Sequence, residues 1–442
     1  MWGWPLIIAI CCIGIYFTIT LGMFRISRLK MSVKSIAGKE ECHGDISVFG
    51  SLCTSISSTI GTGNIVGIAV AVSIGGPGAI FWLWVSSIFS FAIKYAEGVL
   101  AIKYRKFGKD GTIAGGPMYY IEIGLQKNRY SKALAKVFAF FGMIVTLLGT
   151  GTFAQSNSIA SALQSFGFPT IATTIILGII VSIITLKGIK SISAVSEKLV
   201  PIMAVFYIGS ALLIIILNIN SVPQVFCLIF KSAFSPESAL GGGVGVSIAH
   251  VVSVGVRRGI FSHECGLGSA AIASAAAKTK SPARQGFVAM AGAIVSVIVC
   301  SMTGIVLIIT CNDTLILSAS CQLKGALLTS QAFGYGLGIV DIGKYIVGIG
   351  IILFAFTSII GWNYYGEKFT QYLFGDKAIV PFKILYIAFV VMGPYFSVET
   401  IFTIADILTG FMAVTNLIGV VGLRKVVSDE TEKFFRDMKV GQ

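Results

Sequence analysis

The sequence has few charged residues: Asp, Glu, Lys and Arg make up 12% of its 442 residues, whereas apolar residues make up 55%. A soluble protein of this length cannot bury so large an apolar fraction. The apolar residues are gathered in runs of about 20, the length that a helix needs to cross about 30 Å of hydrocarbon. We therefore expect an all-α polytopic membrane protein and exclude a soluble multidomain chain.

Metal-binding and nucleophilic motifs are also lacking. The chain contains 3 His and 9 Cys but no Cys-x-x-Cys pair, which excludes the common zinc and redox motifs. The segment GLGSA at 266–270 is not the Gly-x-Ser-x-Gly of a serine hydrolase. We expect no enzyme. The only cysteines placed to form a disulfide are Cys311 and Cys321, in an expected external loop.

Eleven apolar stretches are long enough to span a membrane. They cover residues 5–24, 46–73, 77–102, 134–164, 170–189, 197–218, 242–277, 286–310, 340–366, 380–396 and 401–423. Basic residues follow the first stretch but do not precede it, so we expect an uncleaved helix rather than a signal peptide. We expect a single transmembrane unit. Its residues 1–45 form a helix and a basic loop, 46–220 and 241–423 hold five spans each, and 424–442 form a cytoplasmic tail.

The basic residues are distributed unevenly along this path. Of the 33 Lys and Arg residues, 29 lie on the side reached after the first span, and only Lys231, Lys324 and Lys344 lie on the other. Basic loops stay in the cytoplasm, so this bias predicts a multi-pass protein of the cytoplasmic (inner) membrane with its N-terminus outside and its C-terminus inside. Topology, not nucleic-acid binding, then accounts for the net charge of +14.

Two spans are interrupted by glycine. The second has three glycines within residues 61–67, and the seventh has four within 255–268. A glycine destabilises a helix by roughly 1 kcal/mol relative to alanine, so these clusters favour breaks; close packing of small residues is the alternative. Each of these two spans is the first in a group of five consecutive spans. Because five is an odd number, the second group crosses the membrane in the opposite orientation to the first. Broken helices at matching positions of an inverted repeat predict a transporter with its site at the midplane.

The first break carries the polar segment SSTIGTGNIVG at 57–67. Free amides at a broken helix end attract a carboxylate, and free carbonyls coordinate a cation. We expect the carbonyls near Ser57 and Ile60 to receive Na+ or an ammonium group. The candidate substrate-binding residues of this segment are Thr59, Thr62, Gly63 and Asn64.

Polar side chains at midspan depth extend the candidate site. Span four carries Gln155 and Asn157, and span nine carries Thr357, Ser358 and Trp362. Burying an unpaired amide in hydrocarbon costs several kcal/mol, so such groups face a partner helix or a cavity. We assign the amides and the indole to substrate and the two hydroxyls to Na+. Hydrogen bonds between helices, and an interfacial anchor for Trp362, are the alternatives.

Few ionisable residues lie within the spans. Lys94 and Glu97 are three residues apart, and we expect them to neutralise each other on one helix face. Glu97, Glu264 and Asp406 are the carboxylates available if the coupling ion were H+. Sodium is favoured because neutral oxygens dominate the candidate site.

Four motifs follow one another along nearly the whole chain. They are GTGNIVGIA at 61–69 running into GGPGAIFWLW at 75–84, AGGPMYYIE at 114–122, RRGIFSHECGLGSAAIASAAAKTKSPARQG at 257–286, and IIGWNYYGEK at 359–368. Together they resemble the alanine or glycine:cation symporter family, which has the inverted-repeat fold of the bacterial leucine transporter. His263 and Cys265 depart from the family pattern, which has Asn and Ala there; this departure bears on substrate range and gating.

The resemblance implies Na+-coupled, or less often H+-coupled, uptake of alanine, glycine or a similar small neutral amino acid. The carbonyls of Ser57 and Ile60 with the hydroxyls of Thr357 and Ser358 resemble the sodium site that joins the first and eighth helices of the repeat. We therefore expect a symporter that works by alternating access in the lipid bilayer. A passive channel and a membrane-embedded enzyme are the less favoured alternatives.

Overall fold

The computed structural model describes residues 3–23, 26–37, 43–108, 112–126, 128–235, 247–312, 325–396 and 398–440. These residues are nearly all helical, with one short hairpin. The helices are α1 (Trp4–Thr20), α2 (Ile26–Ala37), α3 (Val48–Thr59), η1 (Thr62–Asn64), α4 (Val66–Gly75), α5 (Gly78–Lys103), α6 (Pro117–Gly124), α7 (Arg129–Leu148), α8 (Phe153–Ser165), α9 (Thr170–Thr185), α10 (Ile189–Leu217), α11 (Val222–Phe234), α12 (Ile248–His263), α13 (Ala271–Ala275), α14 (Pro282–Asn312), α15 (Ala326–Gly336), α16 (Val340–Phe374), α17 (Ile379–Met392), η6 (Gly393–Tyr395), α18 (Val398–Gly422) and α19 (Arg424–Val440). Strands β1 (Lys106–Phe107) and β2 (Ile113–Ala114) pair antiparallel.

The membrane-spanning helices match the predicted spans. Within the described residues, seven helices are long and apolar enough to cross a membrane, and α3 with η1 and α4 adds an eighth, bent span. The shorter apolar helices α1 and α9, and the pair α12 and α13, occupy the three remaining predicted spans. Helix α11, an apolar helix between the two predicted groups of spans, was not expected.

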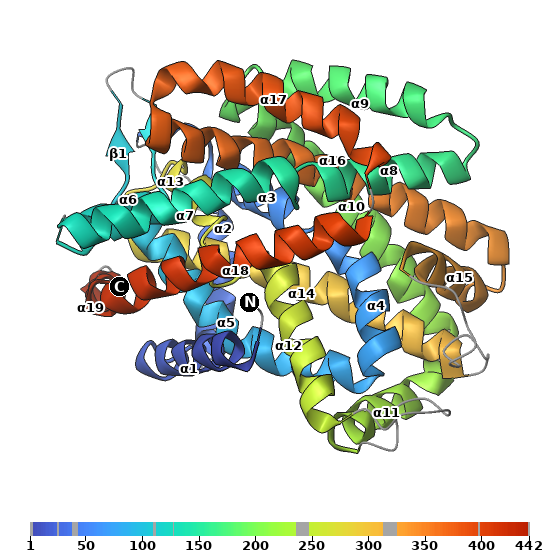
Figure 1. The fold of residues 1–442 in the computed structure, drawn as a ribbon. Helices are drawn as coiled ribbons and strands as arrows, with labels where there is room; N and C mark the ends of the chain where they lie inside the picture. The colour runs from blue at the N-terminus through green and yellow to red at the C-terminus, as the bar shows by residue number, and fades with distance from the viewer. Residues whose placement is uncertain are drawn as a thin grey trace.

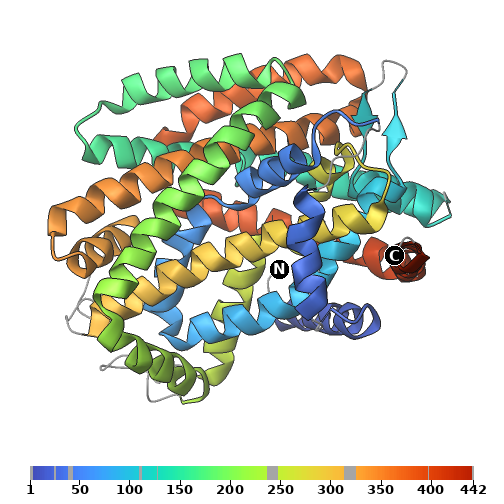
Figure 2. The same cartoon turned by 180° about the vertical axis from the view of Figure 1, so that it is seen from behind.

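The helices are arranged around the broken span. In Figure 1, the hairpin, the C-terminus and α19 lie at one end of the molecule, and α11 and α15 lie at the other. Helix α3 packs against α10, α14 and α16. Seen from behind, α10 and α14 cross the whole molecule (Figure 2). The break after Thr59 is therefore enclosed by helices on several sides.

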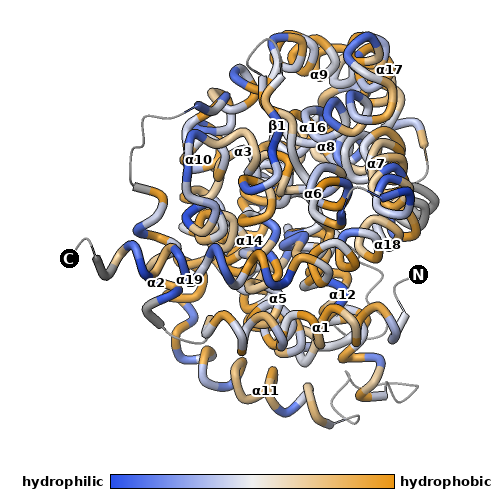
Figure 3. Tube along the Cα trace, turned by 90° about the vertical axis from the view of Figure 1, so that its left-hand side faces the viewer, coloured by the Kyte–Doolittle hydropathy of each residue, from blue (hydrophilic) through white to orange (hydrophobic). Residues whose placement is uncertain are grey.

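The outer helices expose apolar side chains. On α9, Ile171, Ile175, Ile176, Ile179 and Ile183 are each more than half exposed. Such an apolar surface is suited to contact with the hydrocarbon of a bilayer. In water it would promote aggregation. Hydrophobic colour is visible on α9 and α17 in Figure 3, while α19, on the side of the molecule that faces the viewer, also carries hydrophilic segments.

Two segments predicted as a basic loop and as a tail contain helices. The loop within residues 1–45 contains α2, and the tail at 424–442 forms α19, which packs on α5 and α14. Lys103 and Glu430 form an ion pair of 2.5 Å, and the Arg28 guanidinium lies 3.3 Å from the centre of the Phe435 ring. Amphipathic sequences of this kind become helical when a neighbouring helix covers their apolar face.

Three predicted spans are not continuous helices: spans two and seven, whose glycines predict a break, and span four, for which no break was predicted. Span four divides into α7 and α8 at residues 149–152, and span seven divides into α12 and α13. Arg257 and Arg258 were counted with an inner loop, but both lie inside α12, before its break. The direction of the charge bias does not depend on these two residues. Cys321 lies outside the described residues, so its pairing with Cys311 stays a prediction.

Candidate functional site

The first break lies between α3 and α4, which together with η1 bend by 65°. Ile60 leaves the helical conformation with ψ 100°, and Gly61 is extended. The Asn64 side chain accepts a hydrogen bond of 3.2 Å from the Gly61 amide and so closes the loop onto itself. The Gly-Thr-Gly-Asn segment therefore forms a compact turn at the predicted break of this candidate span.

Carbonyl groups at the end of α3 meet side chains of α16. The Ser358 hydroxyl donates to the carbonyl oxygens of Ser57 at 3.0 Å and Ile60 at 3.2 Å. The Trp362 indole donates to the Ser58 carbonyl at 3.1 Å. These carbonyls form the negative end of the half-helix, so they attract positive charge. In this structure two neutral side chains satisfy them.

Thr357 lies beside this group but faces elsewhere. Its hydroxyl donates to the Phe354 carbonyl at 3.0 Å and lies 3.6 Å from the Met203 sulfur. The structure thus brings the Ser57 and Ile60 carbonyls together with the Ser358 hydroxyl and places the Thr357 hydroxyl on the neighbouring face of α16. The hydroxyl of Ser57 is bonded to its own helix at Thr54.

The amide side of the break faces α8. Gln155 accepts a hydrogen bond of 3.3 Å from the Thr62 amide. The Thr62 hydroxyl is buried and has no hydrogen-bond partner among the described residues. A Cβ added to Gly63 would meet no atom within 4 Å. Open space and an unsatisfied hydroxyl therefore lie together at the break, as a small polar ligand requires.

Two other predicted residues point away from this space. The Thr59 hydroxyl donates to the Ser55 carbonyl of its own helix at 2.8 Å. The Asn157 amide points to the carbonyls of Pro394 and Phe396, each at 3.4 Å, next to η6. Gln155 and Asn157, two residues apart on α8, thus face opposite sides of that helix, because successive helical residues are about 100° apart.

Sequence reasoning missed a connection between the two breaks. The Asn64 amide donates to the Ser296 hydroxyl at 2.8 Å, and Ser296 donates to the Ser262 carbonyl in α12 at 2.6 Å. Cys300, one turn further on α14, lies 3.2 Å from the same Asn64 nitrogen. The signal was present, since Ser296 and Cys300 interrupt an apolar helix four residues apart, but nothing in the sequence names their partners.

The second break follows α12 and is built from left-handed backbone. Glu264, Gly266 and Gly268 have φ of 51°, 88° and 79°. Glu97 of α5 accepts the amides of Gly266 at 3.0 Å and Gly268 at 3.1 Å with one carboxylate oxygen. Asn416 of α18 donates to the same oxygen at 2.7 Å. Glutamate thus replaces the missing helical hydrogen bonds of this break.

Glu97 and Lys94 therefore do more than neutralise each other. Lys94 donates to the carbonyls of His263 at 3.1 Å and Glu264 at 3.4 Å, where α12 ends. The Ser269 hydroxyl donates to the Glu264 carboxylate at 2.6 Å. Lys94 and Glu97 of α5 thus both act on the backbone of the second break, an arrangement that their i, i+3 spacing did not predict.

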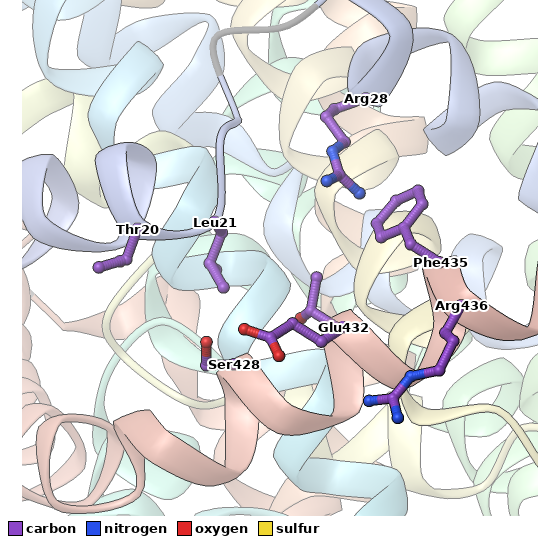
Figure 4. A pocket seen from close by; sticks show the side chains of 8 residues that line it. Thr20, Leu21, Arg28, Ser428, Glu432, Phe435 and Arg436 are labelled. Carbon is purple, nitrogen blue, oxygen red and sulfur yellow. The ribbon is translucent and has the colours of Figure 1, made fainter.

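Two open cavities lie away from both breaks. One, of about 290 Å³, is lined by α1, α2 and α19, and Figure 4 shows Arg28, Glu432 and Arg436 around it. Another, of about 720 Å³, lies between α5 and α19 near Arg105 and Lys433. Neither is lined by a residue of either break, so they are not extensions of the candidate site.

Comparisons with known proteins agree with this architecture. The sequence pattern described as the sodium:alanine symporter family matches residues 1–442. An uncharacterized transporter of Haemophilus influenzae is 46% identical over 445 residues, covering 100% of this chain and 95% of that protein. The sodium/alanine symporter AgcS of Methanococcus maripaludis is 42% identical over 439 residues, covering 98% of this chain and 95% of that protein.

A solved structure supports the fold. The crystal structure of MhsT in complex with L-phenylalanine matches with a TM-score of 0.61 at 12% identity, over 87% of this chain and 90% of that chain. The expected all-α, leucine-transporter-like fold of a multi-pass membrane protein is confirmed. Because one family pattern spans the full length and a relative at 42% identity shares it, the chain belongs to the sodium:alanine symporter family.

Proposed function

We propose that the protein is a Na+-coupled symporter that takes up a small neutral amino acid, such as alanine or glycine, by alternating access. The observation that carries this proposal is the convergence of the Ser57 and Ile60 carbonyls on the Ser358 hydroxyl, within 3.2 Å, at the end of a half-helix. Neutral oxygens at the negative end of a helix are suitable ligands for a small monovalent cation.

Na+ would take the place that the Ser358 hydroxyl hydrogen now holds between the two carbonyls. The Ser358 oxygen then becomes a ligand rather than a donor. Thr357 precedes Ser358 on α16 and joins the set in this proposal by turning its hydroxyl away from the Phe354 carbonyl, to which it now donates, toward the α3 carbonyls. The ion thereby ties α3 to α16 and fixes the backbone of the break.

The substrate carboxylate would bind at the amide side of the same break. Its partners are the backbone amides of Thr62 and Gly63 and the buried Thr62 hydroxyl, which has no hydrogen-bond partner among the described residues. The Gln155 side-chain oxygen now accepts a hydrogen bond from the Thr62 amide. When the substrate carboxylate accepts that hydrogen bond instead, the Gln155 NH2 group can donate to the carboxylate. We leave Asn157 out of this set because its amide faces η6.

The surroundings of the break favour a small side chain. The space beside Gly63 has no atom within 4 Å of an added Cβ, whereas Gly61 has the Ser358 hydroxyl at 2.8 Å and Gln155 at 3.0 Å. Trp362 is fully buried and is held in place by its bond to Ser58. A methyl group or a hydrogen fits between these fixed walls more readily than a long side chain does.

Coupling follows because the two ligands share one element. Na+ that orders the backbone from Ser57 to Ile60 also orders the amides at Thr62 and Gly63, so each ligand raises the affinity for the other. The membrane potential adds roughly 2.3 kcal/mol per charge per 100 mV. With Na+ higher outside, uptake is the expected direction.

Proton coupling is the second candidate, through Glu97, Glu264 or Asp406. The contacts of Glu97 argue against it as the carrier, since one of its oxygens already accepts three hydrogen bonds from the second break and Asn416. A channel would equilibrate the amino acid without accumulating it, and an enzyme would convert it. Intact, accumulated substrate would distinguish a symporter from both.

We further propose a cytoplasmic-membrane location with the N-terminus outside and the C-terminus inside. The basic loops support this orientation. The end that carries β1 and α19 in Figure 1, with Lys103, Arg105 and Lys433, then faces the cytoplasm.

Uptake into proteoliposomes tests the proposal. Labelled alanine and glycine are supplied with an inward Na+ gradient, with matched K+ or choline, and with an imposed proton gradient. Transient accumulation of intact label that needs Na+ is the expected result. Accumulation with a proton gradient alone would show that the coupling ion is a carboxylate-bound proton and not Na+. If neither amino acid accumulates, the substrate assignment is wrong.

A further inference from the structure

A buried lysine covers the C-terminal end of α12. Lys94 is 2% exposed and projects from α5. Its ammonium group donates to the carbonyls of His263 at 3.1 Å and Glu264 at 3.4 Å. These are among the carbonyls that a helix leaves without partners where it ends. A formal positive charge thus lies at the negative end of this half-helix.

The carboxylates around Lys94 make this position favourable for a cation. Glu97 and Glu264 are both buried, and the charge of Lys94 acts on each. Glu97 in turn holds the amides of Gly266 and Gly268. The free carbonyls and the free amides of one break are therefore covered from a single helix, by a lysine and a glutamate one turn apart.

The first break presents the same kind of carbonyl end without such a lysine. There the Ser57 and Ile60 carbonyls meet the Ser358 hydroxyl, and the proposed function places Na+ among them. Both half-helices end at buried positions, and both leave carbonyls that favour a positive charge. One end has a hydroxyl that an ion can join, and the other already holds an ammonium group.

We propose that Lys94 is a tethered cation: a positioning residue that does permanently at the second break what Na+ does reversibly at the first. This inference rests on the proposed function. The second break consequently binds no coupling ion, and its backbone keeps the same geometry whether or not Na+ is present. Through Ser296, which bonds both Asn64 and the Ser262 carbonyl, that fixed backbone supports the first break.

Two variants separate a cationic role from packing. Lys94→Ala removes the ammonium group and leaves space beside two carbonyls and two carboxylates, where a small cation can bind. Lys94→Met also removes the charge but fills the space with an apolar chain of similar length. Uptake of labelled alanine is measured for both against Na+ concentration, with and without methylammonium chloride.

We expect both variants to transport at least about tenfold more slowly than the wild type at low Na+. Added methylammonium, or high Na+, restores Lys94→Ala but not Lys94→Met, and the Na+ dependence of Lys94→Ala is steeper than that of the wild type because a second ion is needed. Wild-type transport by Lys94→Met, or failure of every cation to restore a folded Lys94→Ala, would overturn the proposal.

Folding and the proposed function are controlled separately. If neither variant folds, the neutral pair Lys94→Met with Glu97→Gln is used, since glutamine still accepts the Gly266 and Gly268 amides. If the folded double variant still transports poorly, the result supports a cationic role for Lys94. If its transport recovers, Lys94 only balances the charge of Glu97. If the wild type lacks Na+-driven uptake, the proposed function fails by itself; the tethered cation is then tested by whether methylammonium raises the melting temperature of Lys94→Ala alone.

Discussion

The two breaks in the membrane-spanning helices satisfy their free backbone groups with different chemistry. At the first, between α3 and α4, the partners are neutral: Ser358, Trp362 and Gln155. At the second, after α12, they are charged: Lys94 holds the carbonyls and Glu97 holds the amides. Replacing neutral partners by a bound cation and a bound carboxylate costs little free energy. Displacing a buried ammonium group and a buried carboxylate from their partners costs much more.

This difference assigns separate roles to the two halves of the fold. The first break has room beside Gly63 and an unsatisfied Thr62 hydroxyl. At the second, one of the two glycines has close neighbours: a Cβ on Gly268 would lie 2.5 Å from Pro117 and 2.8 Å from Asn416, whereas one on Gly266 would meet only Leu417, at 3.5 Å. We infer that the first break binds ligands and the second break provides the fixed frame against which they bind.

The largest expected effect comes from adding one methyl group to each break. Gly268→Ala combines a φ of 79° with two contacts below 3 Å, so it destabilises the fold by about 1–3 kcal/mol or more. Gly63→Ala meets no atom and leaves the fold intact, but it fills ligand space and raises the KM for alanine. Thermal unfolding in detergent and uptake kinetics measure the two effects; equal melting temperatures for both variants would remove the distinction.

Removing the Ser358 hydroxyl sharpens the comparison at the sodium side. Ser358→Ala deletes the side chain that meets the Ser57 and Ile60 carbonyls. A hydrogen bond or ligand to a charged group contributes roughly 1.5–3 kcal/mol, so we expect the Na+ concentration for half-maximal uptake to rise about tenfold or more. Ser161→Ala, whose hydroxyl lies on α8 beside Asn157, is the matched control. An unchanged Na+ requirement in Ser358→Ala would contradict the site.

The two amides of α8 provide an internal pair. Gln155→Ala removes the contact to the Thr62 amide, so the KM for alanine is expected to rise by roughly tenfold while the Na+ dependence changes less. Asn157→Ala removes two long contacts near η6 and leaves the KM within about twofold. Radiolabel uptake over a range of alanine concentrations measures both. If Asn157→Ala were the more impaired, the substrate would have to lie on the η6 side of α8.

An effect smaller than those of Ser358→Ala and Gln155→Ala is expected at Trp362. Trp362→Phe keeps an aromatic ring but loses the 3.1 Å bond to the Ser58 carbonyl. A single neutral hydrogen bond contributes about 1 kcal/mol, so uptake falls less than tenfold. Because a smaller ring enlarges the pocket, the ratio of serine to alanine uptake should increase. A drop in transport as large as that of Ser358→Ala would show that Trp362 does more than form a wall.

The sequence predicted the first break better than the second. Glycines and hydroxyls gathered at 57–67 indicate the break and the polar groups proposed to bind ligands there, because local backbone and nearby side chains determine the break. The Lys94 contact could not be predicted, since about 170 residues separate Lys94 from His263 and only tertiary packing brings them together. Local spacing instead favoured a simple pair with Glu97.

Elements stabilised by packing were also missed. Helices α2 and α19 come from polar segments that look like a loop and a tail. Packing stabilises them as helices: α2 contacts α3 and α14, and α19 contacts α5 and α14. Ser296 could be recognised as polar within an apolar span, but its position between Asn64 and Ser262 depends on how α14 crosses both breaks. Long-range contacts therefore account for most of what the sequence left undetermined.

Hydrogen exchange of the two breaks, measured with Na+ and with K+ in the absence of amino acid, tests the central claim most directly. We expect Na+ to slow amide exchange in peptides that cover residues 60–66 and to leave peptides that cover 263–270 unchanged, with Ser358→Ala showing no effect at either place. Protection of 263–270 by Na+ equal to or greater than that of 60–66 would contradict the account, because the second break would then bind the ion as well.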